Sequence, residues 1–369
     1  MLRRIVTNSV ELVKFVFALG LSLSRPQKQH ILNLADALLV SDERKTIANL
    51  NRQLVEAKDD SSVQHTFRDS PWQAADLRGK VLIFLMRTAI QLARGLGLAK
   101  VICLSIDDAL CEKDQATTQL EAVDFHHDHN ASSKKQAVYK NGSVYVVCHL
   151  KIGFISFAIN WRLYLREQTV RRLNRHRPKA QRLKFRSKYQ LARAMLAEVG
   201  PWLPADFQVY ILFDSWYTSA KLIKYCRRQN WHVIAGLKSN RCLNGQKVSQ
   251  WHKELRHKRY ERVSVAAADG SLKTYFVRTL PGRLNQVPFD VCVFISKRHP
   301  RSKAPAYFLC TDLSLTAQAG LVRYGDRWPT EVDNFYLKTR LGIADYQLQA
   351  FEAIEKFSIS HLAWVVDIA

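Results

Sequence analysis

The stretch YGDRWPTEVDNFYLK, residues 324–338, carries the most informative pattern in the chain. Tyr324, Arg327, Glu331 and Lys338 are spaced so that, at about 100° per residue, all four project from one narrow stripe of an α-helix. Ionised groups are rarely buried unless they are paired, so this stripe is poor core material. The carboxylate suits a metal ion, and the phenol and the two cations suit phosphate groups. The plainer alternative is a solvated helix face on which Arg327 and Glu331 form an ordinary i,i+4 pair.

A proline interrupts this stripe. Proline is excluded from helix interiors but favoured at the first helical position. We therefore expect the helix that carries Glu331 and Lys338 to begin at Pro329, with Tyr324 and Arg327 on the preceding turn.

The spacing Y-x2-R-x3-E-x6-K resembles the signature of one branch of the DDE transposases of bacterial insertion sequences. The flanking words fit as well: Arg327-Trp328-Pro329 precedes the glutamate, and LGIADYQLQAFEAIEKFSISHLAWVV follows the lysine. The resemblance implies an α/β fold with a ribonuclease H-like catalytic core and a β-strand insertion before the last catalytic helix. It also implies three carboxylates that hold two Mg²⁺ ions, with Mn²⁺ as an alternative, and Glu331 would be the third carboxylate. Cleavage through a DNA hairpin and a homodimer on DNA belong to the same expectation.

Two apolar runs end in aspartates, as buried strands end at an active site. They are VICLSIDD, residues 101–108, and QVYILFD, residues 208–214. Each acid alone would be read as an ordinary strand-end residue. Asp107 and Asp108 compete for the first position, because neighbouring strand residues point to opposite faces. In the resembling family the ligand precedes a small residue, usually threonine, which favours Asp108 before Ala109, together with Asp214 and Glu331.

The charge of the chain favours a polyanionic partner. Its 369 residues include 56 Lys and Arg against 32 Asp and Glu, a formal charge of +24. A field of that sign suits nucleic acid. No uncharged apolar stretch reaches 18 residues, so the sequence predicts no transmembrane helix. The seven cysteines include no C-x-x-C pair, which predicts a reducing bacterial cytoplasm, with the protein at the nucleoid.

The pattern along the chain predicts four parts. Residues 1–75 form a helical region, a candidate DNA-binding part by family analogy, and 76–239 form the first part of the catalytic core. Residues 240–315 form a β-rich insertion with a hairpin turning at Asp269-Gly270, and 316–369 are C-terminal helices that complete the core. The core strands are expected at 101–106, 144–150, 153–160, 208–213 and 232–237.

A basic stretch, VRRLNRHRPKAQRLKFRSKYQ, occupies residues 170–190. Phosphate contact through Arg171, Arg172, Arg175 and Arg177 is one interpretation, and a solvated loop is the other.

A histidine cluster at His126, His127 and His129 favours a turn near the active site or a DNA contact over a zinc site, because its spacing is irregular. Trp216, Trp231, Trp251 and Trp328 could stack on an unpaired base, but core packing is the default interpretation for each.

The sequence thus predicts a cut-and-paste DNA transposase that acts on terminal inverted repeats and target DNA. Asp108, Asp214 and Glu331 would hold the metal ions, while Tyr324, Arg327 and Lys338 would hold phosphates. The alternatives are a metal-dependent nuclease of the same fold without strand transfer, and a non-catalytic DNA-binding derivative.

Overall fold

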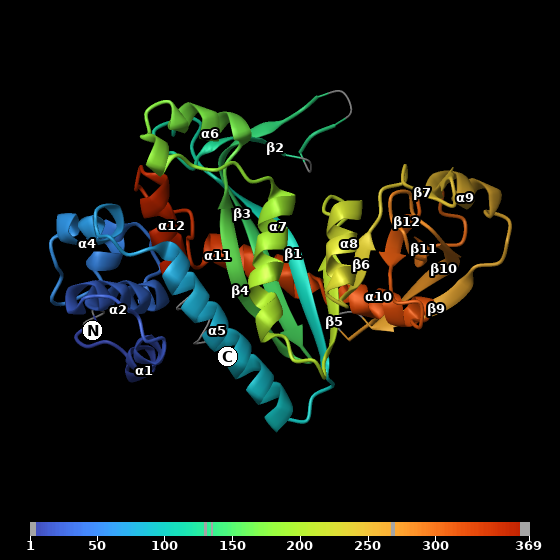
Figure 1. Ribbon diagram of the computed structural model, residues 1–369, viewed down its shortest axis with the longest axis horizontal. Helices are drawn as coiled ribbons and strands as arrows, with labels where there is room; N and C mark the ends of the chain where they lie inside the picture. The colour runs from blue at the N-terminus through green and yellow to red at the C-terminus, as the bar shows by residue number, and fades with distance from the viewer. Residues whose placement is uncertain (1–4, 129–130, 134–135, 267–269, 362–369) are drawn as a thin grey trace.

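The computed structural model describes residues 5–128, 131–133, 136–266 and 270–361 (Figure 1). The α-helices are α1 Val10–Ala18, α2 Arg25–Val40, α3 Ile47–Asn51, α4 Asp60–Arg68, α5 Ala74–Gly95, α6 Glu167–Asn174, α7 Lys188–Val199, α8 Ala220–Arg228, α9 Val248–Glu254, α10 Ala317–Gly325, α11 Trp328–Thr339 and α12 Phe351–Ser360. Two short 3₁₀ helices are η1 Lys179–Gln181 and η2 Gly200–Trp202. The strands are β1 Val101–Glu112, β2 Asp124–His127, β3 Tyr139–Ile152, β4 Ile155–Tyr164, β5 Gln208–Phe213, β6 His232–Gly236, β7 Cys242–Leu243, β8 Gln246–Lys247, β9 Glu261–Ala266, β10 Leu272–Gly282, β11 Val291–Lys297 and β12 Ala306–Cys310.

One large mixed sheet organises the molecule. Its order is β2-β3-β1-β5-β6-β12-β11-β10-β9. Strand β4 also pairs with β3 and lies outside this order. Strands β1, β5 and β6 run parallel, whereas β3 is antiparallel to β1 and β4 is antiparallel to β3. Strands with both faces covered read as nearly continuous apolar runs, and the buried sequence of β5, VYILF, has that form. The sheet is therefore mixed in direction, with its parallel part in the middle.

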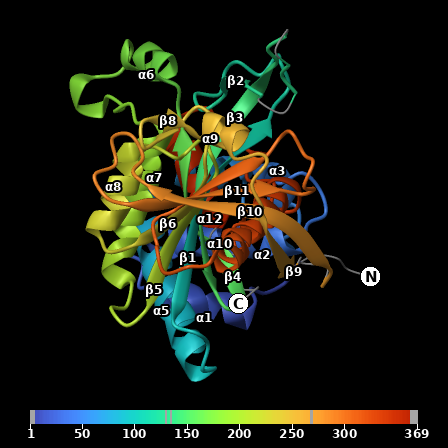
Figure 2. The ribbon, with the colours of Figure 1, turned by 90° about the vertical axis from the view of Figure 1, so that its right-hand side faces the viewer.

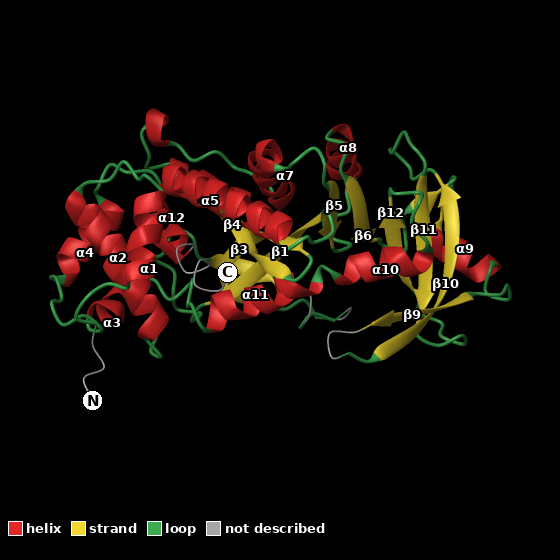
Figure 3. Cartoon of the chain, turned by 90° about the horizontal axis from the view of Figure 1, so that it is seen from below, coloured by secondary structure: helices red, strands yellow, loops and turns green. Residues whose placement is uncertain are grey.

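Helices cover both faces of this sheet. Figure 3 shows α5, α7 and α8 on one side of the strands and α10 and α11 on the other. Successive side chains of β1 point to opposite faces of the sheet and so pack against different helices. Ile102, Leu104 and Ile106 join the larger apolar cluster, while Cys103 joins a second cluster with Leu212 and with Leu321 of α10. Odd-numbered residues of β1 thus face α10 and α11.

Strand β1 is longer than the sequence predicted. It continues to Glu112, because the long strand β3 keeps pairing with it as far as the Glu112–Gly142 pair. Strand β5 stops earlier, and the last parallel pair is Ile106 with Phe213. Asp107 and Asp108 consequently lie within a strand, at the point where β1 loses its neighbour on one edge. The missing neighbour opens space beside the two aspartates.

The β-rich insertion extends the same sheet. Strand β12 pairs antiparallel with β6, and β11, β10 and β9 follow in turn. Figure 2, which looks onto the insertion, shows β9, β10 and β11 in front of the core strands. The hairpin of β9 and β10 was predicted from the sequence, although Asp269 of its expected turn lies outside the described residues. The insertion is thus joined to the core by strand pairing.

The N-terminal helices pack against the end of the chain. The Phe67 ring of α4 contacts the Phe357 ring of α12, with centroids 5.7 Å apart. Arg78 of α5 lies 3.3 Å from Glu355, and Lys356 Nζ donates to the Ser70 carbonyl at 2.6 Å. The first and last helices therefore share one apolar cluster with the core.

The break between α10 and α11 follows the sequence prediction closely. Helix α10 ends at Gly325, and α11 begins at Trp328 with Pro329 in its first turn. Tyr324 lies in the last turn of α10, and Arg327 is the residue before α11. Glu331 and Lys338 lie on α11 itself.

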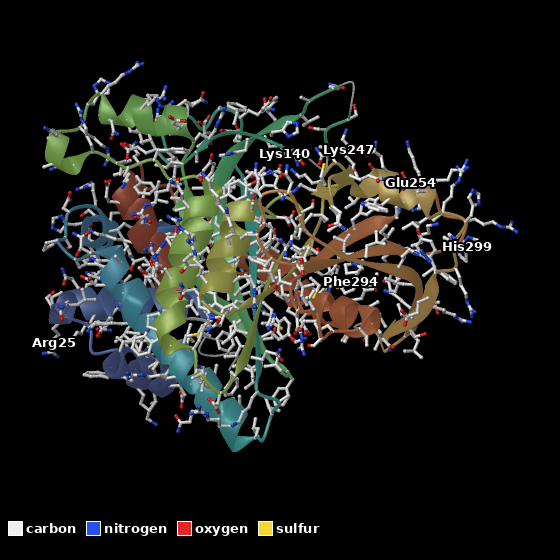
Figure 4. The ribbon with its side chains drawn as sticks, turned by 45° about the vertical axis from the view of Figure 1, so that its right-hand side comes forward. Arg25, Lys140, Lys247, Glu254, Phe294 and His299 are labelled. Atoms are coloured by element: carbon white, nitrogen blue, oxygen red, sulfur yellow. The ribbon has the colours of Figure 1, made fainter. Side chains whose placement is uncertain are left out.

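We predict opposite effects for two glycines of α10. A Cβ on Gly320 would lie 2.5 Å from Cε2 of the fully buried Phe294, which is labelled in Figure 4, whereas a Cβ on Gly325 would meet nothing within 4 Å. Gly320→Ala should lower the free energy of unfolding by about 1–3 kcal/mol through overpacking. Gly325→Ala should leave it unchanged or raise it by up to about 1 kcal/mol. Urea denaturation of both variants measures this, and equal stabilities would show that α10 can shift away from the sheet.

Candidate active site

The two aspartates of β1 point to opposite faces of the sheet. Asp107 Oδ2 lies 2.9 Å from Arg327 Nη1, on the side of α10 and α11. Asp108 Oδ2 lies 2.6 Å from Lys188 Nζ at the start of α7, on the other side. The sequence analysis had placed Asp108 with Asp214 and Glu331. The structure instead brings Asp107 to that face, because odd-numbered residues of β1 share it with Asp214 of the neighbouring strand.

Asp214 is held by the loop that follows β5. Its Oδ1 accepts hydrogen bonds from the backbone N–H groups of Trp216 at 2.9 Å and Tyr217 at 3.2 Å. Thr218 Oγ1 donates to the Asp214 carbonyl at 2.9 Å. A Cβ on Gly236 would lie 2.9 Å from the Ser215 nitrogen, so the end of β6 approaches this loop as closely as only glycine allows. The second carboxylate oxygen of Asp214 therefore has a fixed direction.

Arg327 connects β1 to α11. Its Nη1 contacts Asp107, and its Nη2 forms a short contact with Glu331 Oε1. Burial raises the pKa of Asp107 to about 6, although Arg327 opposes the shift, and the nearby charges of Asp108 and Asp214 add to it. The Arg327 guanidinium also lies over the Tyr324 ring at 5.8 Å. Three residues of the 324–338 stripe thus lie together beside Asp107.

A cleft of about 940 Å³ lies beside the two aspartates of β1. Asp107, Asp108, Asp214 and Lys338 all line it. Its walls also carry Lys140, which Figure 4 labels, and Arg166, Lys188 and Lys238. A cleft lined by both carboxylates and cations suits a phosphodiester with a bound divalent ion.

A second network forms around Asp108. Tyr217 Oη donates to its Oδ1 at 3.0 Å, while Lys188 holds Oδ2. The Lys188 ammonium also lies over the rings of Trp216 at 5.1 Å and Tyr164 at 5.4 Å. Both oxygens of Asp108 are thereby engaged. Sequence reasoning missed the roles of Lys188 and Tyr217; the only signal was the capping pattern at Ser187 and Gln190, which places Lys188 at the first position of α7.

The chemistry of the donor set fits a hard divalent cation. Asp107, Asp214 and Glu331 offer carboxylate oxygens, the ligands that Mg²⁺ prefers. In the described part of the chain no three acidic, histidine or cysteine side chains are already gathered around one point. Glu331 is instead held by the Arg327 guanidinium.

The basic stretch contains arginines with and without an acidic partner. Arg177 contacts Glu121 at 2.6 Å and also forms a short contact with Glu352 of α12. Arg171 lies 2.6 Å from Glu167, within α6. Arg172 and Arg175 are exposed, and among the described residues neither has a salt bridge. Arg177 is thus engaged in packing, which the sequence did not indicate.

His126, His127 and Trp216 line the cleft, whereas the other residues of these two sets lie elsewhere or outside the described residues. Burial, with a contribution from Lys188, lowers the pKa of His126 to about 4. His127 contacts the Tyr139 ring, and His129 lies outside the described residues. Trp231 is buried as expected, but Trp328 is 56 % exposed, so core packing is the wrong interpretation for that residue.

Comparison with known proteins identifies the family. A model of the DDE superfamily endonucleases matches residues 19–273, more than half of the chain. The chain belongs to this family. A model of the transposase DDE domain matches residues 186–365, which include Asp214 and Glu331. Among solved structures, this DDE endonuclease is similar to one described as the cryo-EM structure of a piggyBac transposase synaptic complex with hairpin DNA. The two are 13 % identical, with 96 % of this chain and 70 % of that chain covered and a TM-score of 0.46. A search of curated proteins gave no match.

We predict a pH-dependent gain in stability for Asp107→Asn in metal-free buffer. The folded pKa of about 6 exceeds the ordinary 3.8, so the fold favours the protonated carboxyl. The stabilisation that this proton gives is complete below the unfolded pKa and is lost as the pH rises through about 6. The neutral amide should therefore raise the free energy of unfolding at pH 7.5 by roughly 1–2 kcal/mol, and with it the melting temperature. At pH 4 the substitution should have little effect on either.

Asp108→Asn is the matched control, since it leaves Lys188 without its acidic partner and should lower the melting temperature at pH 7.5. A gain for Asp107→Asn that is the same at both pH values would contradict the burial of an ionised Asp107.

Proposed function

We propose that this protein is a DNA transposase that cleaves its element ends and joins them to target DNA with two divalent metal ions. The observation that carries the proposal is the position of three carboxylates. Asp107 of β1 and Asp214 after β5 line a cleft that lysines also line, and Arg327 joins Asp107 to Glu331 of α11. Family membership supports the chemistry, and the Tyr324-Arg327-Glu331-Lys338 spacing supports the insertion-sequence branch.

The strand arrangement supports a ribonuclease H-like core. In that core, three strands pair antiparallel in sequence order and two parallel strands follow on the other side of the first. The path β4-β3-β1 with β5 and β6 has this arrangement. The first and second carboxylates then come from neighbouring parallel strands, and the third comes from a later helix on the same face.

We therefore assign to Asp107 the metal-ligand position that the family resemblance gave to Asp108. It shares a face with Asp214, and Arg327 joins it to Glu331. Asp108 holds Lys188 and the Tyr217 hydroxyl, so its role is to fix a cation in the cleft.

The residues of the site have separate roles in metal binding and phosphate binding. Bound Mg²⁺ ions would orient the attacking water or DNA 3′-hydroxyl and stabilise the leaving 3′-oxygen. Asp107, Asp214 and Glu331 would hold these ions, and the Trp216 and Tyr217 amides fix the orientation of Asp214. Arg327 and Lys338 bind phosphate oxygens and position the scissile bond. A homodimer on DNA would bring two such sites to the paired ends.

The decisive experiment compares four isosteric variants in a nicking assay with Mg²⁺. Asp107→Asn, Asp214→Asn and Glu331→Gln should each reduce nicking by at least about a thousandfold, because each removes one ligand charge. DNA binding should persist or strengthen, since the phosphates face less negative charge. Asp108→Asn should be markedly milder, although it loosens Lys188. An inactive Asp108→Asn beside an active Asp107→Asn would restore Asp108 as the ligand.

The products discriminate the related functions. Joining of the cleaved ends to a second DNA supports transposition, whereas cleavage without joining would indicate a nuclease. Normal cleavage by all four variants would exclude the three-carboxylate site.

We predict that Arg172 and Arg175 of the basic stretch contact DNA without sequence preference. Arg172→Ala with Arg175→Ala should weaken binding to every duplex, and should lower the slope of log affinity against log salt by about 1.8, near 0.9 for each lost phosphate contact. Arg171→Ala with Arg177→Ala removes the same charge from residues that are paired with acids. That control should change the salt slope less and, through Arg177, lower the melting temperature. Equal salt slopes for the two double variants would show that Arg172 and Arg175 make no specific contribution to DNA binding.

A further inference from the structure

A second cavity adjoins the catalytic cleft. It has a volume of about 320 Å³ and lies between the loop after β5, the start of α8 and the segment after β6. Tyr189, Ser215, Trp216 and Lys238 line both this cavity and the cleft. The two spaces are therefore neighbours that share one wall. In Figure 1 the elements concerned, β5, α8 and β6, lie side by side between the core and the insertion.

The second cavity is strongly basic. Lys221, Lys238 and Arg241 line it, and its lining includes no Asp or Glu. Among the described residues no salt bridge engages any of the three cations, in contrast to Arg177 or Lys188. Arg241 Nη1 donates to the Thr218 carbonyl at 3.0 Å, which fixes its guanidinium in the wall. Three like charges without a counter-charge repel one another, so the cavity favours an anionic occupant.

The shared wall is flat and rigid. The Tyr189 and Trp216 rings stack with centroids 4.8 Å apart and planes 4° apart. Tyr189 Oη donates to the Trp216 carbonyl at 2.7 Å, so the pair is tied together at both ends. The Trp216 amide in turn holds Asp214 Oδ1 at 2.9 Å. The wall is therefore fixed to the catalytic carboxylate, and a group in the second cavity keeps a constant position relative to the reacting centre.

We propose that this cavity binds the backbone phosphate next to the scissile phosphate on the same DNA strand. The proposal rests on the proposed function, because it takes the strand in the catalytic cleft as given. The strand passes over the Tyr189–Trp216 pair, and its next phosphate meets the ammonium groups of Lys221 and Lys238. Arg241 completes the cavity from its anchored position. The contact carries no base information, since only the phosphate is bound.

The test measures binding without divalent metal, so that it does not depend on catalysis. The probe is a short fluorescein-labelled single strand of mixed sequence, titrated at several salt concentrations. Lys221→Ala with Lys238→Ala should lower the slope of log affinity against log salt by roughly 1.4, near 0.7 for each lost contact on a single strand. The control is Lys253→Ala with Lys258→Ala, which removes the same charge from exposed residues in and beside α9. It should lower the slope by much less, and equal slopes for the two pairs would overturn the proposal.

A second readout tests the position of the phosphate. Strands that each carry one neutral methylphosphonate linkage are bound to the wild type and to the Lys221/Lys238 double variant. One linkage position should weaken wild-type binding several-fold and have no further effect on the double variant. Equal losses in both proteins at every position would overturn the subsite while leaving the proposed function intact. Failure of the wild type to bind any strand would overturn both.

Discussion

An ionised carboxylate on a central strand needs a counter-charge, and the rest of the site depends on how Asp107 obtains one. Removing such a group from water costs several kcal/mol unless a partner compensates it. Arg327 compensates Asp107 and at the same time contacts Glu331, so one guanidinium fixes the start of α11 against β1. Pro329 directs the chain into the new helix at this point, and the break after α10 lets Tyr324 and Arg327 approach the strand. Asp107, Arg327 and the break between α10 and α11 thus form a single structural unit.

The sheet places this unit at an opening. Because β5 ends at Phe213 while β1 continues along β3, the strand edge next to Asp107 is uncovered. The loop from Asp214 to Ser219 occupies the rim of this opening, and Gly236 allows β6 to approach it from below. On the far side, β12 continues the pairing from β6, so the insertion is held in register with the strands that carry the aspartates. Strand pairing therefore links strands β9–β12 to the strands beside the cleft.

The sequence was sufficient for the broad architecture and insufficient for side-chain direction. Apolar runs with turn residues between them predicted β5, β6 and the β9–β10 hairpin, and the proline rule predicted the start of α11. Periodicity could not decide between Asp107 and Asp108, since a register error of one residue exchanges the two faces of a strand. The family pattern favoured Asp108, while the contact with Arg327 depends on how α11 packs. The pairing of Arg177 with Glu121 and Glu352 joins segments far apart in the chain, so local sequence held no signal for it.

The packing of the first helices on α12 has a consequence for synthesis. Arg78 and Glu355 are 277 residues apart, yet their elements share one core. At about 5–20 residues per second, a ribosome needs roughly 15–55 s to make the intervening chain. Throughout that time the apolar faces of α2 and α4 lack the helix that covers them. Contacts of such long range also slow folding, because a large loop must close before they form. The packing of α12 on α2 and α4 thus depends on contacts that form only after the long intervening chain has been made.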